Sequence, residues 1–319
     1  TTVGGGILNV QNSGALGGSA VSIRSLAAGL QLQGGITVPN NIITSNDGSG
    51  ATGYAIANVS GDNTISGSIS MTDGAGNTVV LSDTGSLNLA GNVTNIHATS
   101  TRTLFLQGAS TAANTVSGVV SNGTPATLVT KRESGTWTLS GFNTYTGATS
   151  VEGGILAITG SLGNTPVAVS GGTLSLQSSS AVSQNTVTLS GTGLLTQTVN
   201  GAISGSASLV IQTPAVMSMP NSYTGDTTIN AGTSMPLTIT NASAAGTGRL
   251  NAATGATTPI FNLHIDGGGL ITMPNGFGGN SGVATTIDVN NNGSGSNGLI
   301  QLNGVAKYGN GTLNVTGGN

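Results

Sequence analysis

The acidic residues are the side chains of this sequence that come closest to a catalytic set. Two carboxylates held about 5–9 Å apart cleave glycosidic bonds. Asp62 and Asp83, like Glu133 and Glu152, are about 20 residues apart, so each pair could meet only if successive turns of the chain stack. The other acids are scattered, and we expect turn residues and no enzyme activity. These other acids are Asp47, Asp73, Asp226, Asp266 and Asp288.

Metal-binding side chains are also few and far apart. His97 and His264 stand alone, and the chain has no cysteine, so the sequence offers no zinc site and no thiolate chemistry. Asp-Gly turns at Asp47, Asp73 and Asp266 resemble isolated calcium loops, but the tandem Gly-Gly-x-Gly-x-Asp repeat of calcium-binding β-rolls is missing. We expect no metal and no cofactor, and we place His264 on the outer face of a strand.

The composition bounds the class of protein. Among 319 residues, 54 are Gly, 5% are charged and 3% are aromatic, whereas 36% are hydrophobic and the net charge is −3. Disorder would require fewer apolar residues and a higher net charge. Among six basic residues only Lys131 and Arg132 adjoin, so we expect no nucleic-acid partner. No run reaches the ~18 apolar residues of a spanning helix, so we expect no membrane span.

Short alternating segments, separated by Gly, Asn or Ser, run along the whole chain. Apolar residues alternate with small polar ones, as in Leu87–Leu89, Leu174–Leu176 and Val187–Leu189. A period of two indicates strands with one buried face, and the residues between them favour turns. Residues typical of helix surfaces are scarce. The sequence therefore predicts an all-β protein.

One longer phrase recurs and decides among the all-β folds. Its complete copy occupies residues 135–156, a second copy occupies 213–233, and a divided copy joins residues 311–319 to residues 1–8. A sandwich needs no such recurrence, whereas in a solenoid each coil stacks on its neighbour and buries a continuous core. We therefore predict a single elongated β-solenoid over residues 1–319, with about 20–25 residues per coil and about 4.8 Å between coils.

The recurring phrase resembles the passenger-associated transport repeat of bacterial autotransporters. We interpret the matching residues as structural, because they suit turns, corners and ladders between coils. In the first copy they include Gly135, Trp137, Leu139, Gly141, Asn143, Tyr145, Gly147, Thr149 and Gly154. In the second copy they include Asn221, Tyr223 and Gly225.

The resemblance implies both a fold and a location. Proteins with this repeat have right-handed parallel β-helix passengers that are secreted to the bacterial cell surface or beyond it. Many act as adhesins or self-associating proteins, so the implied partners are neighbouring cells, surface glycans or further copies of the same chain.

The divided copy suggests a function. Thr1 corresponds to Thr149 and Asn319 to Asn143, so a second chain that followed the first would nearly restore the phrase. Unpaired strand edges invite association, and complementary ends produce open fibres. We predict an extracellular structural protomer that stacks head to tail into a filament or surface layer. The residues expected at the interface are Thr1, Thr2, Val3, Leu313, Val315 and Asn319.

Two alternatives stay open. The chain could be a segment of a longer autotransporter adhesin or self-associating passenger, which would explain the divided copy without polymerisation. It could also be a polysaccharide-active β-helix enzyme, for which the acidic pairs are the sole support.

Overall fold

All regular structure in the described part of the chain is β-strand, and the strands pair in parallel. The computed structural model describes residues 1–45, 48–50, 52–72, 77–230, 235–254, 256–267, 269–279, 283–290, 299–304, 307–308 and 312–317. Successive coils stack on one another, and the predicted all-β fold, a parallel β-solenoid, is confirmed. The chain divides into two compact units: unit 1 is residues 1–167 with 171–175, and unit 2 is residues 168–170 with 176–319.

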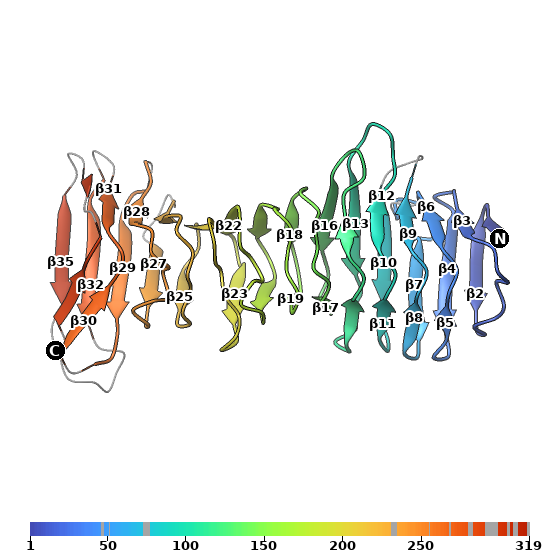
Figure 1. The fold of residues 1–319 in the computed structure, drawn as a ribbon, viewed down its shortest axis with the longest axis horizontal. Coiled ribbons are helices and arrows are strands. Elements are labelled where there is room, and N and C mark those ends of the chain that lie inside the picture. The colour runs from blue at the N-terminus through green and yellow to red at the C-terminus, as the bar shows by residue number, and fades with distance from the viewer. Residues whose placement is uncertain are drawn as a thin grey trace. The chain divides into compact units, whose positions relative to one another are not determined.

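Unit 1 contains three parallel sheets, to which successive coils contribute strands in chain order (Figure 1). The first sheet is β1 (Thr2–Val3), β3 (Val21–Ile23), β6 (Ile42–Thr44), β9 (Ile69–Met71), β12 (Val93–Asn95) and β15 (Val120–Ser121). The second is β2 (Gly6–Val10), β4 (Ala28–Gln33), β7 (Ile56–Ser60), β10 (Thr78–Ser82), β13 (Arg102–Gln107), β16 (Thr127–Lys131) and β18 (Thr149–Val151). The third is β5 (Thr37–Val38), β8 (Asn63–Ile65), β11 (Leu87–Leu89), β14 (Asn114–Val116), β17 (Thr136–Leu139) and β19 (Ile155–Ile158). Two further strands, β20 (Val167–Val169) and β21 (Thr173–Leu176), hold residues of both units.

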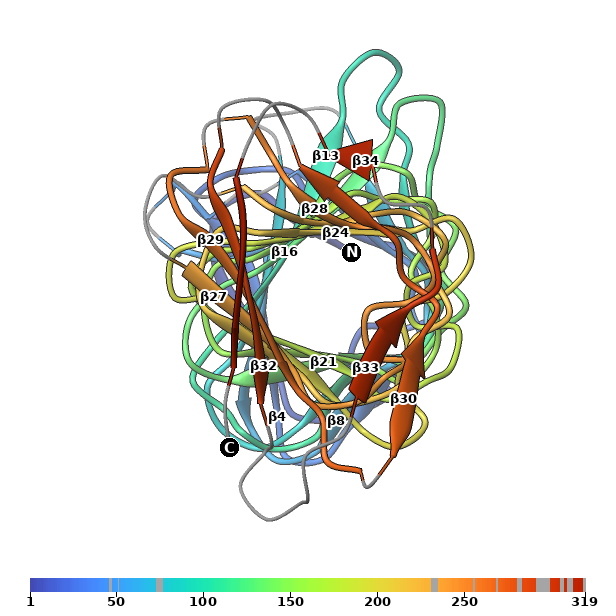
Figure 2. The same ribbon diagram turned by 90° about the vertical axis from the view of Figure 1, so that its left-hand side faces the viewer.

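Unit 2 repeats the coiled arrangement, and Figure 2 shows β24 with β28, β29 with β32, and β30 with β33 on three different sides of the coil. One sheet is β22 (Thr186–Leu189), β24 (Ser208–Ile211), β26 (Thr227–Ile229), β28 (Leu250–Ala252), β31 (Phe277–Gly279) and β34 (Lys307–Tyr308). Another is β25 (Ala215–Met217), β27 (Met235–Ile239), β29 (Pro259–His264), β32 (Thr285–Asn290) and β35 (Leu313–Gly317). A pair is formed by β30 (Leu270–Met273) and β33 (Leu299–Leu302), and β23 (Leu194–Gln197) lies outside the β25 sheet.

Inward-facing residues form columns that run from coil to coil. In the second sheet of unit 1, Leu30 pairs with Ile56 and Ile56 pairs with Val80, and all three are 0% exposed. Each buried aliphatic side chain of this size contributes about 1.5–3 kcal/mol to stability. Outward-facing residues form polar ladders instead, as where Asn9 Nδ2 donates to Gln31 Oε1 at 3.1 Å. The alternation in the sequence therefore separates a dry interior from a polar surface.

Coil length varies more than the sequence suggests. Leu209 pairs with Thr227, which makes a coil of 18 residues, whereas Thr285 pairs with Leu313, which makes a coil of 28 residues. Parallel pairing fixes the register of the strands, but the connections between strands run over the surface and tolerate insertion. The predicted coil length of 20–25 residues is therefore a central value, and individual coils differ from it in the lengths of their loops.

A column of glycines follows the third sheet of unit 1. Gly67, Gly91, Gly118, Gly141 and Gly160 each lie two residues after a strand of that sheet ends. A Cβ atom added to any of the last four would lie 2.0–2.4 Å from the carbonyl oxygen of the preceding glycine in the column. The coils approach so closely at this corner that no side chain fits. Gly141 of the first repeat belongs to this column, which was not predicted from the sequence.

Substitution within the glycine column should destabilise unit 1. In Gly118→Ala, the new methyl group would meet the Gly91 carbonyl oxygen at 2.1 Å, so the coils must separate locally, at a cost of about 1–3 kcal/mol. Gly18→Ala is the control, because nothing lies within 4 Å of its added Cβ. Urea unfolding followed by circular dichroism measures both variants. Equal stability of the two would contradict the close packing of this corner.

Candidate functional site

Asn143 of the first repeat joins three successive coils. Its Oδ1 accepts the N–H of Val120, in the preceding coil, at 2.8 Å. Its Nδ2 donates to the carbonyl oxygens of Gly141 at 3.0 Å and Ser161 at 2.9 Å, in its own coil and the next. Because Asn143 is only 5% exposed, each of these bonds is costly to lose.

Asn221 forms the same connection in the second repeat. Its Oδ1 accepts the N–H of Ile203 at 2.8 Å, and its Nδ2 donates to the carbonyl oxygens of Met219 at 3.1 Å and Ala244 at 2.7 Å. Met219 stands where the first repeat has Gly141, yet its carbonyl oxygen serves equally well. Unlike Asn143, Asn221 also bonds a side chain of the preceding coil: its Oδ1 accepts from Gln197 Nε2 at 2.7 Å, and its Nδ2 donates to Gln197 Oε1 at 3.3 Å.

The repeat tyrosines fill the corner that follows each asparagine. Tyr145 is fully buried, and its hydroxyl lies 2.7 Å from Thr149 Oγ1, which lies 3.0 Å from Thr165 Oγ1. Tyr223 is buried in the same way and bonds Thr227. Burial raises the pKa of both phenols, because the phenolate would lose its water. Both hydroxyls act as structural links between a turn and the next strand.

The remaining motif residues fill the core or mark close backbone approaches. Trp137 and Leu139 of β17 are fully buried, and Trp137 Nε1 donates to the carbonyl oxygen of Gln107 at 3.0 Å. Gly154 has a φ of 60°, which favours glycine. An added Cβ would lie 2.4–2.5 Å from a backbone oxygen of the preceding coil at Gly135, Gly147 and Gly225.

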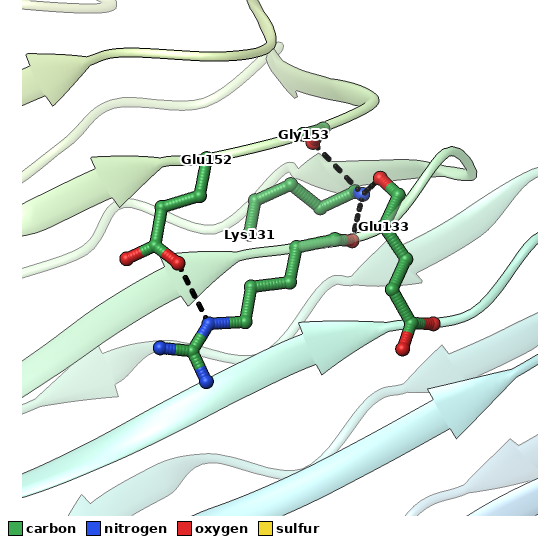
Figure 3. A network of polar contacts seen from close by, with 5 residues as sticks. Lys131, Glu133, Glu152 and Gly153 are labelled. Atoms are coloured by element: carbon green, nitrogen blue, oxygen red, sulfur yellow. Dashed lines mark hydrogen bonds and ion pairs between the residues drawn. The ribbon is translucent and has the colours of Figure 1, made fainter.

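Lys131 occupies a position in the hydrophobic core of unit 1. It pairs with Leu106 on one side and Val151 on the other, so it takes an inward place within an aliphatic column. It is 0% exposed, and its ammonium group turns toward the end of the strand, where carbonyl groups replace water (Figure 3). Its Nζ donates to the carbonyl oxygens of Arg132 at 2.5 Å, Glu133 at 2.8 Å and Gly153 at 3.2 Å.

Burial lowers the pKa of Lys131 to about 8, and the negative charge of Glu133 opposes this shift. The backbone of Glu133 has a φ of 58°, a value that residues other than glycine rarely adopt. Its side-chain Oε2 accepts the N–H of Gly108 at 2.7 Å. In the sequence, Lys131 stands out only as a basic neighbour of Arg132. Lys131 follows Thr127 and Val129 at a spacing of two residues, and this alternation predicts that the Lys131 side chain faces the core.

A polar cavity of about 330 Å³ lies on the surface of unit 1 beside this network. The guanidinium of Arg132 lies 4.1 Å above the centre of the Phe105 ring, and its Nε lies 2.7 Å from Glu152 Oε2. The ion pair is exposed to solvent, so it orients Arg132 more than it stabilises the fold. The cavity is lined by Gly48, Ser49, Gly53, Asn77, Val79, Phe105, Gln107 and Arg132.

The carboxylates considered for catalysis bind neighbouring coils. Asp62 Oδ1 accepts the N–H and hydroxyl of Ser86 at 3.1 and 2.8 Å, and Asp83 accepts the N–H of Ala109 at 3.1 Å. Glu133 and Glu152 are held by Gly108 and Arg132, as described above. Each acid of the two predicted pairs therefore has its own structural partner. Asp226 forms an ion pair with Arg249, whereas Asp47 and Asp73 lie outside the described residues.

His264 forms a link between coils of unit 2. Its Nε2 lies 2.9 Å from Asp288, whose other oxygen accepts the Thr316 hydroxyl at 2.7 Å. Hydrogen bonds from Thr316 and His264 hold the pKa of Asp288 below its usual value. The threonine bonds the carboxylate and not the imidazole, so the three do not form a nucleophile–base–acid relay. Across the described residues, no three metal-binding side chains cluster.

Four of the six residues predicted for an end-to-end interface lie on strands that, among the described residues, pair on one side. Thr2 and Val3 belong to β1, which pairs with β3, and Thr1 precedes it. Leu313 and Val315 belong to β35, which pairs with β32, and are 42% and 68% exposed. Asn319, with Gly311 and Gly318 of the divided copy, lies outside the described residues. Stacking of one chain on another stays a prediction.

Comparison with known proteins agrees with the repeats. The passenger-associated-transport-repeat family matches residues 129–158 and 215–233, which contain both asparagine links. Over 100 residues the chain is 39% identical to the adhesin BmaC autotransporter of Brucella suis biovar 1 (strain 1330). That match covers 30% of this chain and 3% of the adhesin, so the chain corresponds to a small fraction of this curated relative. No solved structure matches the chain.

The repeats and the fold together define the class of protein. The chain is a parallel β-solenoid of the autotransporter passenger type, with two passenger-associated transport repeats. Its location is the extracellular side of a bacterial cell surface. Within the described ranges, the structure has no helix of the length and apolar character that crossing a bilayer requires.

Removal of the Asn143 side chain should destabilise unit 1. Asn143→Leu keeps the size of the side chain but leaves the buried Val120 N–H without a partner, which costs about 1–3 kcal/mol. The Gly141 and Ser161 carbonyl groups lose one donor each but keep the backbone N–H groups of Ser161 and Asn143. Phe142→Ala is the control, because Phe142 is 73% exposed and should change stability by less than about 0.5 kcal/mol. Urea unfolding midpoints compare the two. A leucine variant as stable as the control would refute the three-coil role of Asn143.

The ionisation of Lys131 should make stability depend on pH. The unfolded chain keeps this proton up to a pKa of 10.5, but the folded chain releases it near 8, so the unfolded state binds more protons between these values. The unfolding free energy should therefore rise as the pH increases from about 8 to about 9.5, below the tyrosine range. Lys131→Met fills the same column without an ionisable group. Thermal unfolding should show the rise in the parent and not in the variant; identical pH profiles would count against this assignment.

Proposed function

We propose that this chain is a segment of a bacterial surface adhesin passenger, which binds neighbouring cells or their surface glycans and catalyses no reaction. One observation carries the proposal. The chain holds two passenger-associated transport repeats on a parallel solenoid and is 39% identical over 100 residues to a bacterial adhesin.

The state of the acidic residues supports a binding role. Glycoside hydrolysis needs one carboxylate to give up a proton and another to attack or activate water. In this structure Asp62, Asp83, Glu133 and Glu152 each accept hydrogen bonds from adjacent coils. The same residues that would have to react with a sugar therefore hold the coils in register.

The polar cavity of unit 1 is the proposed glycan contact. Arg132 and Gln107 provide guanidinium and amide groups that suit the hydroxyl groups of a sugar, and the Phe105 ring beneath Arg132 holds the guanidinium in place. The oxygen of Asn77 accepts the N–H of Thr103 at 2.8 Å, so this side chain is held in place before a ligand binds. Because Glu152 balances Arg132, an uncharged sugar fits the cavity better than an acidic one.

The filament-forming protomer predicted from the sequence has less support than the adhesin segment. The likeness to an adhesin favours the alternative, and stacking rests on the divided repeat together with the one-sided pairing of β1 and β35. The proposal includes self-association between passengers on neighbouring cells, because the surface around the polar cavity of unit 1 can also contact a second passenger.

Binding of purified chain to bacterial cells, host cells and a glycan array tests the proposal. The parent chain should bind, and Arg132→Gln should weaken binding by about tenfold, as loss of a charge-assisted hydrogen bond predicts. Arg249→Gln is the matched control, because Arg249 is also a surface arginine paired with one acid but lies in unit 2.

Three outcomes are distinguishable in this experiment. Selective loss in Arg132→Gln supports the cavity as the contact. Equal loss in both arginine variants would show charge attraction and refute the cavity. If the parent chain binds neither cells nor glycans but hydrolyses the glycans, the adhesin proposal is wrong.

A further inference from the structure

One face of unit 2 loses its strand pairing at a single step. β23 and β25 directly follow β22 and β24, and these two pair over their whole length, from Thr186 with Ser208 to Leu189 with Ile211. β23 and β25 nevertheless belong to different sheets, and β25 pairs with β27 on its other side. The two strands therefore present facing edges that are not hydrogen-bonded to each other.

Flanking hydrogen bonds show which peptide groups point into this gap. The Met217 carbonyl accepts the N–H of Thr240 at 3.0 Å, so Met217 faces β27, and by strand alternation the N–H and C=O of Val216 face β23. On the opposite edge, Thr198 N–H donates to the Leu176 carbonyl at 3.0 Å. The same alternation turns the peptide groups of Leu195 toward β25.

The core is open at the same place. Leu237 of β27 is 0% exposed, whereas Ala215, its inward-facing partner on β25, is half-buried. Leu195 on β23 is also half-buried. On the outer face, Leu194 and Val216 are 56% and 64% exposed. Apolar side chains and backbone groups are thus exposed together.

These residues line an apolar groove of about 360 Å³ within unit 2. None of the side chains that line it is charged. Pro214 and Pro236 also line the groove, and neither has a backbone N–H that could pair across it. Among the lining residues are Leu189, Leu194, Leu195, Val216 and Met217.

We propose that this groove binds an extended, uncharged apolar segment of another polypeptide, which adds a strand between β23 and β25. Strand addition satisfies exposed backbone groups, and alternate side chains of the added segment fill the pockets on either face. β25 has three residues, so a segment of three or four residues, about 10–13 Å long, matches the groove. A charged side chain would be desolvated there without a counter-charge, so the segment is uncharged at these positions.

A pair of peptides tests strand addition on the full chain. The probe is a fluorescent, capped Thr-Val-Thr-Val-Thr peptide, and its partner is N-methylated at both valines, which keeps the side chains but removes N–H groups from one edge. The unmethylated peptide should bind in a fluorescence anisotropy titration, and the methylated one should bind at least about tenfold more weakly. Equal binding of the two would overturn the proposal, because the groove would then take apolar groups without pairing.

Variants at the groove locate the binding. Val216→Pro removes the N–H that faces the groove but leaves the pairing of Met217 with β27, so it should weaken peptide binding by at least about tenfold. Val216→Thr is the control, because it keeps the N–H and the shape, and it should bind like the parent. Circular dichroism confirms that both variants fold. Undiminished binding by Val216→Pro would overturn the proposal. Failure of the parent chain to bind the peptide would also overturn it. This second outcome includes the case in which sedimentation shows that another copy of the chain occupies the groove.

Discussion

Hydrogen bonding between coils about 4.8 Å apart is the constraint on which the rest of this structure depends. Every buried backbone N–H and C=O of one coil must find a partner in the coil before or after it. The strands meet this demand by parallel pairing. The glycine column shows its strictest consequence, because Gly91, Gly118 and Gly141 allow neighbouring coils to meet with no side chain between them. Composition follows from the same demand, since small polar residues form ladders on a surface where few charges are needed.

Turns between strands are where backbone pairing lapses, and there buried polar side chains replace it. Asn143 and Asn221 supply an acceptor to the preceding coil and donors to their own and the next. The Lys131 side chain extends from a core column to three carbonyl groups at a turn. One ammonium group therefore provides hydrogen-bond donors where the strands end. The repeat motif is therefore a device for joining coils at their corners. These links join the coils without disulfide bonds, because the chain has no cysteine.

The sequence predicted the parts of this structure that depend on local pattern. Alternation located strands such as β11 and β22, and the repeated phrase distinguished a solenoid from a sandwich. The asparagine, tyrosine and glycine positions of the motif were interpreted as structural from the sequence, but their partners were not found, because Val120 and Ile203 lie in other coils. Pairing between coils of 18 to 29 residues depends on loop lengths that no local pattern encodes.

The sites were harder to predict for the same reason. Glu133 and Glu152 were paired in the sequence by spacing alone, whereas the structure gives each a different partner. The cavity beside Arg132 and the groove between β23 and β25 arise from where neighbouring coils fail to cover one another. Such places depend on register and burial, so sequence alone does not reveal them.

Amide hydrogen exchange at Val120 and Ile203 tests the central claim most directly. These two N–H groups are bonded to asparagine side chains of the following coil, so they should exchange as slowly as the amides of the paired strands β13 and β24. In Asn143→Leu the protection of Val120 should be lost while that of Ile203 persists. Exchange of both amides at the rate of exposed turns in the unaltered chain would contradict the account.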